Sequence, residues 1–220
     1  MQSSSMDKLW WSLVRLGFRL LYNEMAFTYD LVSAVVSLGQ WPAWQRAALD
    51  HIAAEPGARV LELAHGTGRM QIALRSAGYH TTAIDLSREM GRLARQRALR
   101  WGYRPALSRA RAEMLPFAAS QFDAVVSTFP TEFIISPHTL AEVVRVLRPG
   151  GQLVVVFNGI LTRRNPATAA LEFAYRVTGQ RGPWPLDIEE RLAQAGLQSH
   201  AVQEHLPRSV VMLFVGEKAE

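Results

Sequence analysis

The chain contains no cysteine among its 220 residues, which excludes disulfide bonds, thiolate-held zinc and a cysteine nucleophile. It also has no long apolar run. The longest near the start, residues 9–21, is interrupted by Arg15 and Arg19 and is shorter than the roughly 20 residues that span a bilayer. The same arginines make this run a poor signal peptide. We therefore expect a cytoplasmic protein, and we predict no metal site.

The net charge limits the kinds of partner that the chain can have. Lysine and arginine outnumber aspartate and glutamate by 24 to 19, so nucleic acid, a membrane surface or an acidic substrate must be considered as partners. Charge alone does not choose among them. The hydrophobic fraction of 49% is that of a globular protein with a sizeable core.

Seven short strand-like runs alternate with helix-like runs from residue 59 onward, which predicts a doubly wound α/β fold with helices on both faces of a mostly parallel sheet. The last two runs are predicted to pair as an antiparallel hairpin. Pro56 and Gly57 end the helical segment before the first strand. We therefore divide the chain into an N-terminal helical lid, 1–56, and a sheet domain, 57–220. The strand-like runs are 59–64, 79–85, 105–110, 122–129, 151–157, 199–205 and 209–216.

Capping signals mark three helix starts. Ser87 is expected to cap the helix 88–100, and Ser136 followed by a proline is expected to start the helix 137–147. Asp187 with Glu190 resembles a capping box for a last helix that Gly196 ends.

A glycine-bearing turn follows the first strand in the stretch VLELAHGTGRM, residues 60–70. Gly66 and Gly68 let the backbone approach a ligand at the carboxyl edge of the sheet. A dinucleotide site would need G-x-G-x-x-G, but Ala64 and Gln71 stand at its first and last glycine positions. The turn therefore argues against a nicotinamide cofactor.

Two acidic residues flank this turn. Glu62 precedes it, and Asp85 ends the next strand, where a carboxylate can accept both ribose hydroxyls. This arrangement suits an adenosyl ligand. The sequence here resembles class I S-adenosylmethionine-dependent methyltransferases, and is most like the ubiquinone/menaquinone-biosynthesis type. The resemblance rests on ELAHGTG (62–68), AIDLSREM (83–90), AEMLPFAASQFDAVVST (112–128) and EVVRVLRPGGQLVVV (142–156), with YDLVSAVVSLGQWPAWQRAAL (29–49) before them.

The resemblance implies a Rossmann-like domain, S-adenosylmethionine as cofactor and a small-molecule methyl acceptor. It implies that Glu62 organises the turn and helps to position the amino-acid end of the cofactor, and that Asp85 binds the ribose. The sequence departs from the family at Ala64, usually glycine, and at Arg111, often an aspartate that receives the adenine amino group. That role then falls to Glu113 or the nearby backbone. The implied cofactor-binding residues are Glu62, Ala64, His65, Gly66, Thr67, Gly68, Asp85, Leu86, Met90, Ala112, Glu113, Met114, Thr128 and Phe129.

The acceptor side is less defined. Residues 159–185, with Phe173, Tyr175 and Trp184, are expected to form part of an apolar acceptor pocket for a small aromatic or prenylated molecule. Tyr22, Tyr29 and Asp30 belong either to a lid over the active site or to ordinary helix packing, and His65 either touches a ligand or caps the turn. A phenol or hydroquinone acceptor would benefit from a general base. The sequence does not rank the candidates, which are Tyr22, Tyr29, His65, Glu132 and His138.

Three function classes stay open: a small-molecule O- or C-methyltransferase, a nucleic-acid-modifying methyltransferase, and a non-catalytic binding module. Nucleic acid would use an arginine belt around residues 88–111, but such runs are more often a solvated helix face. The stretch after the fourth strand also lacks the N-P-P-Y-like motif of amino-directed nucleic-acid methyltransferases, so nucleic acid is disfavoured. The basic, aromatic-rich first helix either covers the pocket or makes a peripheral membrane contact.

Overall fold

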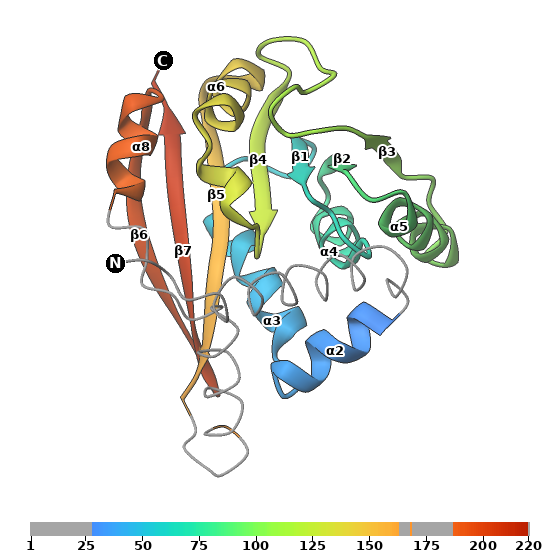
Figure 1. The fold of residues 1–220 in the computed structure, drawn as a ribbon. Helices are drawn as coiled ribbons and strands as arrows, with labels where there is room; N and C mark the ends of the chain where they lie inside the picture. Colours follow the sequence, from blue (N-terminus) through green and yellow to red (C-terminus); the bar gives the residue numbers. More distant parts are fainter. Residues whose placement is uncertain (1–27, 163–167, 169–186, 220) are drawn as a thin grey trace, which may run out of the picture.

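Figure 1 presents the fold of the computed structural model, which describes residues 28–162, 168 and 187–219. Seven strands form one sheet in the order β3-β2-β1-β4-β5-β7-β6. Neighbouring strands are parallel except that β7 runs antiparallel to both β5 and β6. The predicted Rossmann-like sheet with an antiparallel last strand is confirmed. The strands are β1 (Arg59–Leu63), β2 (His80–Asp85), β3 (Ala106–Arg109), β4 (Phe122–Thr128), β5 (Leu147–Leu161), β6 (Leu197–Leu206) and β7 (Ser209–Lys218).

Helices pack on both faces of this sheet (Figure 1). One core joins α3, η2 and α4 to the sheet through residues such as Trp44 and Val154, and the other joins α6 and α8 to it through residues such as Leu140 and Val155. Consecutive residues of β5 thus enter opposite cores, as expected for a strand buried on both faces. The helices are α2 (Tyr29–Val36), α3 (Trp41–Arg46), η2 (Ala47–His51), α4 (Arg69–Ser76), α5 (Arg88–Arg100), η3 (Glu132–Ile135), α6 (Pro137–Val146) and α8 (Ile188–Gln194).

The N-terminal segment before β1 shares the core of the sheet where it is described. Trp44 of α3 is buried, and its indole Nε1 donates to Ser209 Oγ of β7 at 2.8 Å. The indole also lies so close to Gly159 of β5 that a Cβ there would stand 2.2 Å from the ring. The division at residue 56 stays a prediction. Tyr22, the apolar run 9–21 and the acceptor residues Phe173, Tyr175 and Trp184 lie outside the described residues.

The capping predictions have mixed outcomes. Ser87 Oγ accepts a hydrogen bond from the backbone N–H of Met90 at 3.2 Å, which confirms the cap of α5. Ser136 stands at the N-cap of α6, but its side chain makes no capping bond. The prediction of a capping box at α8 is wrong, because the Asp187 carboxylate instead accepts from Arg191 Nε at 2.6 Å, one turn further on. The arginine outcompetes the weaker backbone donor because its bond is charge-assisted.

Membrane-spanning helices are absent from the described residues: none of the helices there combines the length and the hydropathy needed to cross a bilayer.

Candidate active site

The turn after β1 holds three residues in the left-handed backbone region. Ala64, Gly66 and Gly68 have φ values of 56°, 51° and 79°. An alanine in this region carries strain of about 1 kcal/mol, because its Cβ approaches the next carbonyl oxygen. Gly68 is required for a second reason: an added Cβ would lie 2.8 Å from the Cβ of Ala94, where α5 packs against the turn. The turn is therefore fixed tightly against α5.

Asp85 ties this turn to β2. Its Oδ2 accepts from the backbone N–H of Gly66 at 2.9 Å, and its Oδ1 accepts from the backbone N–H of Ser87 at 2.8 Å. Each carboxylate oxygen keeps a further lone pair, so the carboxylate can also accept from a ligand hydroxyl. The pairing places the acidic group at the carboxyl edge of the sheet, where open α/β folds bind ligands.

A cavity of about 580 Å³, here called the turn cavity, opens beside this turn. A Cβ added at Gly66 would meet no atom of the described residues within 4 Å, so the backbone there borders open space. The Asp85 carboxylate and the open turn fit the adenosyl part of S-adenosylmethionine. The carboxylate can accept hydrogen bonds from the ribose hydroxyls, and small and apolar side chains lie beside it. Predicted cofactor residues on the cavity wall are Ala64, Gly66, Asp85, Leu86, Ala112, Glu113, Thr128 and Phe129.

Aromatic side chains build the wall of the turn cavity that faces α2. Tyr29 and Phe129 both border the cavity. The Phe129 ring stacks on Trp41 with ring centroids 4.0 Å apart, and Tyr29 meets the same indole edge-on at 6.4 Å. Phe129 directly follows β4 and has a φ of 52°, a strained conformation for a bulky residue. This left-handed conformation turns the backbone where Phe129 borders the turn cavity.

Glu62 is buried below the turn and does not border the turn cavity. Its Oε2 accepts from Gln71 Nε2 of α4 at 2.7 Å, whereas Oε1 has no hydrogen-bond partner among the described residues. Burial raises the pKa of Glu62 to about 8. Burial, together with the charge of Glu62, also raises the pKa of nearby Tyr103 to about 12. Glu62 thus links β1 to α4 directly beneath the turn.

The other predicted turn residues point into the protein rather than into the turn cavity. His65 is buried, its Nδ1 donates to the Gly66 carbonyl at 2.8 Å, and burial lowers its pKa. Thr67 Oγ1 donates to Asp30, while Gly68 caps α4 and Met90 is buried in the core.

Three further predicted residues lie at the surface. Met114 is exposed, and Glu132 and His138 are exposed on η3 and α6; none of the three borders the turn cavity. Of the proton-acceptor candidates in the described residues, Tyr29 alone stands on the cavity wall.

The region where Arg111 replaces the family's aspartate lies at the rim of the turn cavity. Arg111 and Glu113 both border it, with Arg111 Nε 3.8 Å from Glu113 Oε2. Arg109, which the sequence did not single out as a site residue, donates from Nε to the carbonyl of Leu86 at 2.9 Å and also borders the cavity. It fixes the backbone that follows Asp85. Its only sequence signal was membership of the arginine belt.

A clamp joins α2 to the turn, and its centre is Asp30. Thr67 Oγ1 donates to Asp30 Oδ1 at 2.8 Å, Arg69 Nε donates to the same oxygen at 2.9 Å, and Arg97 Nη2 pairs with Oδ2. Arg97 also donates from Nη1 to the Thr67 carbonyl at 2.6 Å. Burial alone would raise the pKa of Asp30, but the bonds from Arg69, Thr67 and Arg97 hold it below its usual value. The clamp holds α2 beside the turn cavity.

Comparison with known proteins agrees with this geometry. A family model described as a methyltransferase domain matches residues 60–151. The demethylmenaquinone methyltransferase of Renibacterium salmoninarum is 37% identical over 138 residues, which are 61% of this chain and 56% of that protein. The enzyme of the same name from Thermus thermophilus is 35% identical over 164 residues, covering 73% of this chain and 72% of that protein. The chain spans little more than half the length of the first of these relatives.

Solved methyltransferase structures share the fold at low sequence identity. The geranyl diphosphate C-methyltransferase of Streptomyces coelicolor, solved with S-adenosyl-L-homocysteine, has a TM-score of 0.61 and 15% identity over 80% of this chain and 79% of that chain. A phosphoethanolamine N-methyltransferase of Haemonchus contortus, solved with S-adenosyl-L-methionine, has a TM-score of 0.62 and 16% identity over 83% of this chain and 53% of that chain. The chain belongs to the class I S-adenosylmethionine-dependent methyltransferases, and its relatives within them are of the menaquinone-biosynthesis type.

Proposed function

We propose that this chain transfers the methyl group of S-adenosylmethionine to a ring carbon of a quinol that carries an apolar chain. The observation that carries the proposal is that one cavity combines Asp85 and the open glycine turn with the aromatic wall of Tyr29 and Phe129. A flat, apolar acceptor packs favourably against such rings. The names of the curated relatives, demethylmenaquinone methyltransferases, support an acceptor of this class.

When bound, the cofactor would supply a methyl group activated by its sulfonium, with the neutral thioether as the leaving group. The contribution of the chain is then orientation and exclusion of water. Asp85 holds the ribose end, and the aromatic wall holds the acceptor ring flat against the reacting side. Loss of a hydroxyl proton from the quinol to solvent would increase electron density on the neighbouring ring carbon, which would bond to the methyl carbon as the sulfur–methyl bond breaks. That ring carbon would then lose its own proton to solvent and restore the aromatic ring, and the hydroxyl oxygen would regain a proton, so that one proton is released in total.

Tyr29 is the residue that we assign to the acceptor hydroxyl, because it stands on the wall of the turn cavity beside Phe129. Its phenol can accept the hydrogen bond of a hydroxyl or return a proton to it. We expect Tyr29→Phe to lower kcat by about a hundredfold or more, the lower end of the range for lost acid–base catalysis. The affinity for the cofactor stays within twofold.

Cofactor binding is tested first and by itself. Isothermal titration with S-adenosylmethionine should give saturable binding, weakened by about tenfold in Asp85→Asn, since one charge-assisted hydrogen bond is lost. Asp50→Asn is the matched control, because Asp50 is an exposed aspartate that does not border the cavity. No binding to folded protein at millimolar cofactor would refute the assignment.

The acceptor is tested with labelled cofactor and three molecules: a demethylated naphthoquinol with a prenyl chain, the same quinol without the chain, and a short RNA. We expect methylation of the prenylated quinol, with the label on carbon when the product is identified by mass spectrometry. Label on oxygen refutes the ring-carbon assignment, and labelled RNA refutes the acceptor class. If the cofactor binds and Asp85→Asn weakens that binding, a failure to methylate the quinol means that the acceptor is wrong and not that the cofactor site is.

A further inference from the structure

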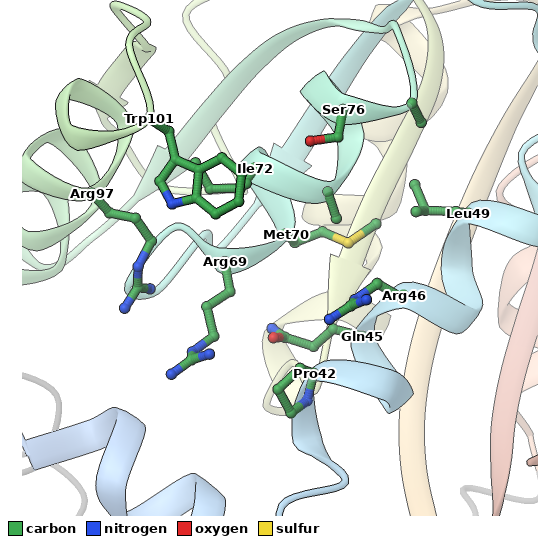
Figure 2. A pocket seen from close by; sticks show the side chains of 12 residues that line it. Pro42, Gln45, Arg46, Leu49, Arg69, Met70, Ile72, Ser76, Arg97 and Trp101 are labelled. Carbon is green, nitrogen blue, oxygen red and sulfur yellow. The ribbon is translucent and has the colours of Figure 1, made fainter. Parts of the chain in front are cut away.

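A second cavity, of about 480 Å³, lies between α3, α4 and α5 and shares no lining residue with the turn cavity. We call it the arginine cavity. Figure 2 shows Arg46 and Gln45 of α3 on one side of this space, Arg97 and Trp101 on the other, and Arg69 and Met70 of α4 between them. Three arginines from three different helices therefore surround one hollow.

The charge in the arginine cavity is strongly unbalanced. Among the described residues, its lining contains three guanidinium groups and no aspartate or glutamate. The carboxylate of Asp30 in the clamp pairs with Arg69 and Arg97 and offsets one of the three charges. About two positive charges remain without a carboxylate in the described part of the chain, which is the charge that a phosphate dianion would neutralise.

Free donors remain for such an anion. Arg46 is exposed and makes no hydrogen bond or ion pair with the described residues. Arg69 uses only Nε toward Asp30, so neither of its two terminal nitrogens has a partner in the described part of the chain. Guanidinium groups bind phosphate through paired N–H donors. The cavity thus offers two arginines from different helices to one anion.

Apart from Gln45 and Ser76, the rest of the arginine cavity is apolar. Leu49, Met70, Ile72 and Ala73 line it, and the exposed indole of Trp101 stands at its edge. A free inorganic phosphate ion would make no contact with these apolar side chains. A phosphate attached to an apolar chain would use both parts, because the arginines bind the anion while the aliphatic side chains and the indole contact the chain.

We propose that the arginine cavity is a binding site for a phosphate group carried on an apolar chain, separate from the cofactor and acceptor site. The ligand is either the headgroup of an anionic lipid in a membrane or a soluble phosphate-bearing amphiphile, and both present the same chemistry. The site does not depend on the proposed methyl acceptor, because the two cavities have different walls.

The direct test is calorimetric titration of the full chain with dihexanoyl phosphatidic acid below its micelle concentration. We expect saturable binding. Dihexanoylglycerol, which lacks the phosphate, and inorganic phosphate, which lacks the chain, should each bind at least about tenfold more weakly, since each gives up one of the two contributions. Equal affinity for either control compound would overturn the proposal, as would an absence of binding to the phosphatidic acid.

A matched pair of variants excludes non-specific charge attraction. Arg46→Gln removes an exposed arginine that lines the arginine cavity, and Arg95→Gln removes an exposed arginine of α5 that does not. We expect Arg46→Gln to weaken phosphatidic acid binding by about tenfold and Arg95→Gln to change it by less than twofold. Equal effects of the two variants would overturn the site. Unchanged binding of S-adenosylmethionine verifies that both variants are folded.

Vesicles distinguish the two sources of the ligand. If the lipid headgroup is bound in a membrane, the chain sediments with phosphatidic acid vesicles but not with phosphatidylcholine vesicles, and Arg46→Gln reduces the retained fraction. Binding of the short-chain compound without vesicle retention supports a soluble amphiphile instead.

Discussion

Glu62 offers the sharpest test of the energetics beneath the turn. It is fully buried, one of its carboxylate oxygens has no hydrogen-bond partner in the part of the chain that the structure describes, and its pKa rises from an ordinary 4.5 to about 8. Between these two values the folded protein keeps a proton on Glu62 that the unfolded chain releases. Stability from this group is therefore complete below pH 4.5 and is lost as pH rises toward 8. Glu62→Gln removes the titration, because the amide of glutamine does not ionise. Glutamine also keeps the shape of the protonated acid.

The size of the effect follows from the proton count. Between pH 5.5 and 7.5 unfolding releases close to one proton from Glu62, so the wild-type protein loses about 2 to 3 kcal/mol over this window relative to the glutamine variant. His65 contributes with the opposite sign, because burial lowers its pKa and the unfolded chain binds the extra proton. Both proteins contain His65, so its contribution cancels in the difference.

Urea unfolding at a series of pH values measures this difference directly. Both proteins should have similar m-values, and the gap between their unfolding free energies should widen steadily in favour of Glu62→Gln as the pH rises. A gap that is constant from pH 5.5 to 7.5 would refute the reasoning, because Glu62 would then be ionised in both the folded and the unfolded chain over this window.

Four smaller changes probe the turn and the clamp by urea unfolding and cofactor titration. Gly68→Ala should lose about 1 to 3 kcal/mol of stability, since its Cβ would stand 2.8 Å from Ala94 Cβ. Gly66→Ala should lower the unfolding free energy only by the left-handed strain of about 1 kcal/mol. Relative to that loss of stability, it should lower the affinity for the cofactor more than Gly68→Ala does, because the methyl group enters the turn cavity. Ala64→Gly should gain up to about 1 kcal/mol by relieving the same strain; a loss contradicts it. Asp30→Asn should cost about 1 to 3 kcal/mol, because two arginines lose their carboxylate; an unchanged midpoint contradicts it.

The sheet was predictable because local signals along the chain agree with one another. Pro56 and Gly57 separate a helical segment from a strand, and Ser87 supplies the cap that starts α5. The same kind of signal failed at Asp187, where Arg191 one turn away offers a stronger donor than the backbone. A capping pattern does not reveal which donor competes for the carboxylate, so local sequence alone does not decide such cases.

The contacts around the turn were less predictable because they join distant residues. Asp30 and Arg97 are 67 positions apart, and nothing local in the sequence indicates that they pair. Arg97 read as one more member of a basic helix, yet it faces inward toward the turn while Arg95 is exposed. Glu62 was expected to help position the cofactor, but only the fold reveals that its side chain turns away from the cavity toward Gln71.

Helix α2 connects the two cavities through consecutive residues. Tyr29 borders the turn cavity, and Asp30 holds two of the arginines that line the arginine cavity. Neighbouring residues on a helix point about 100° apart, so one short helix can serve both sites. The Asp30 clamp therefore lies between the two sites and contacts both, even though their walls have no residue in common.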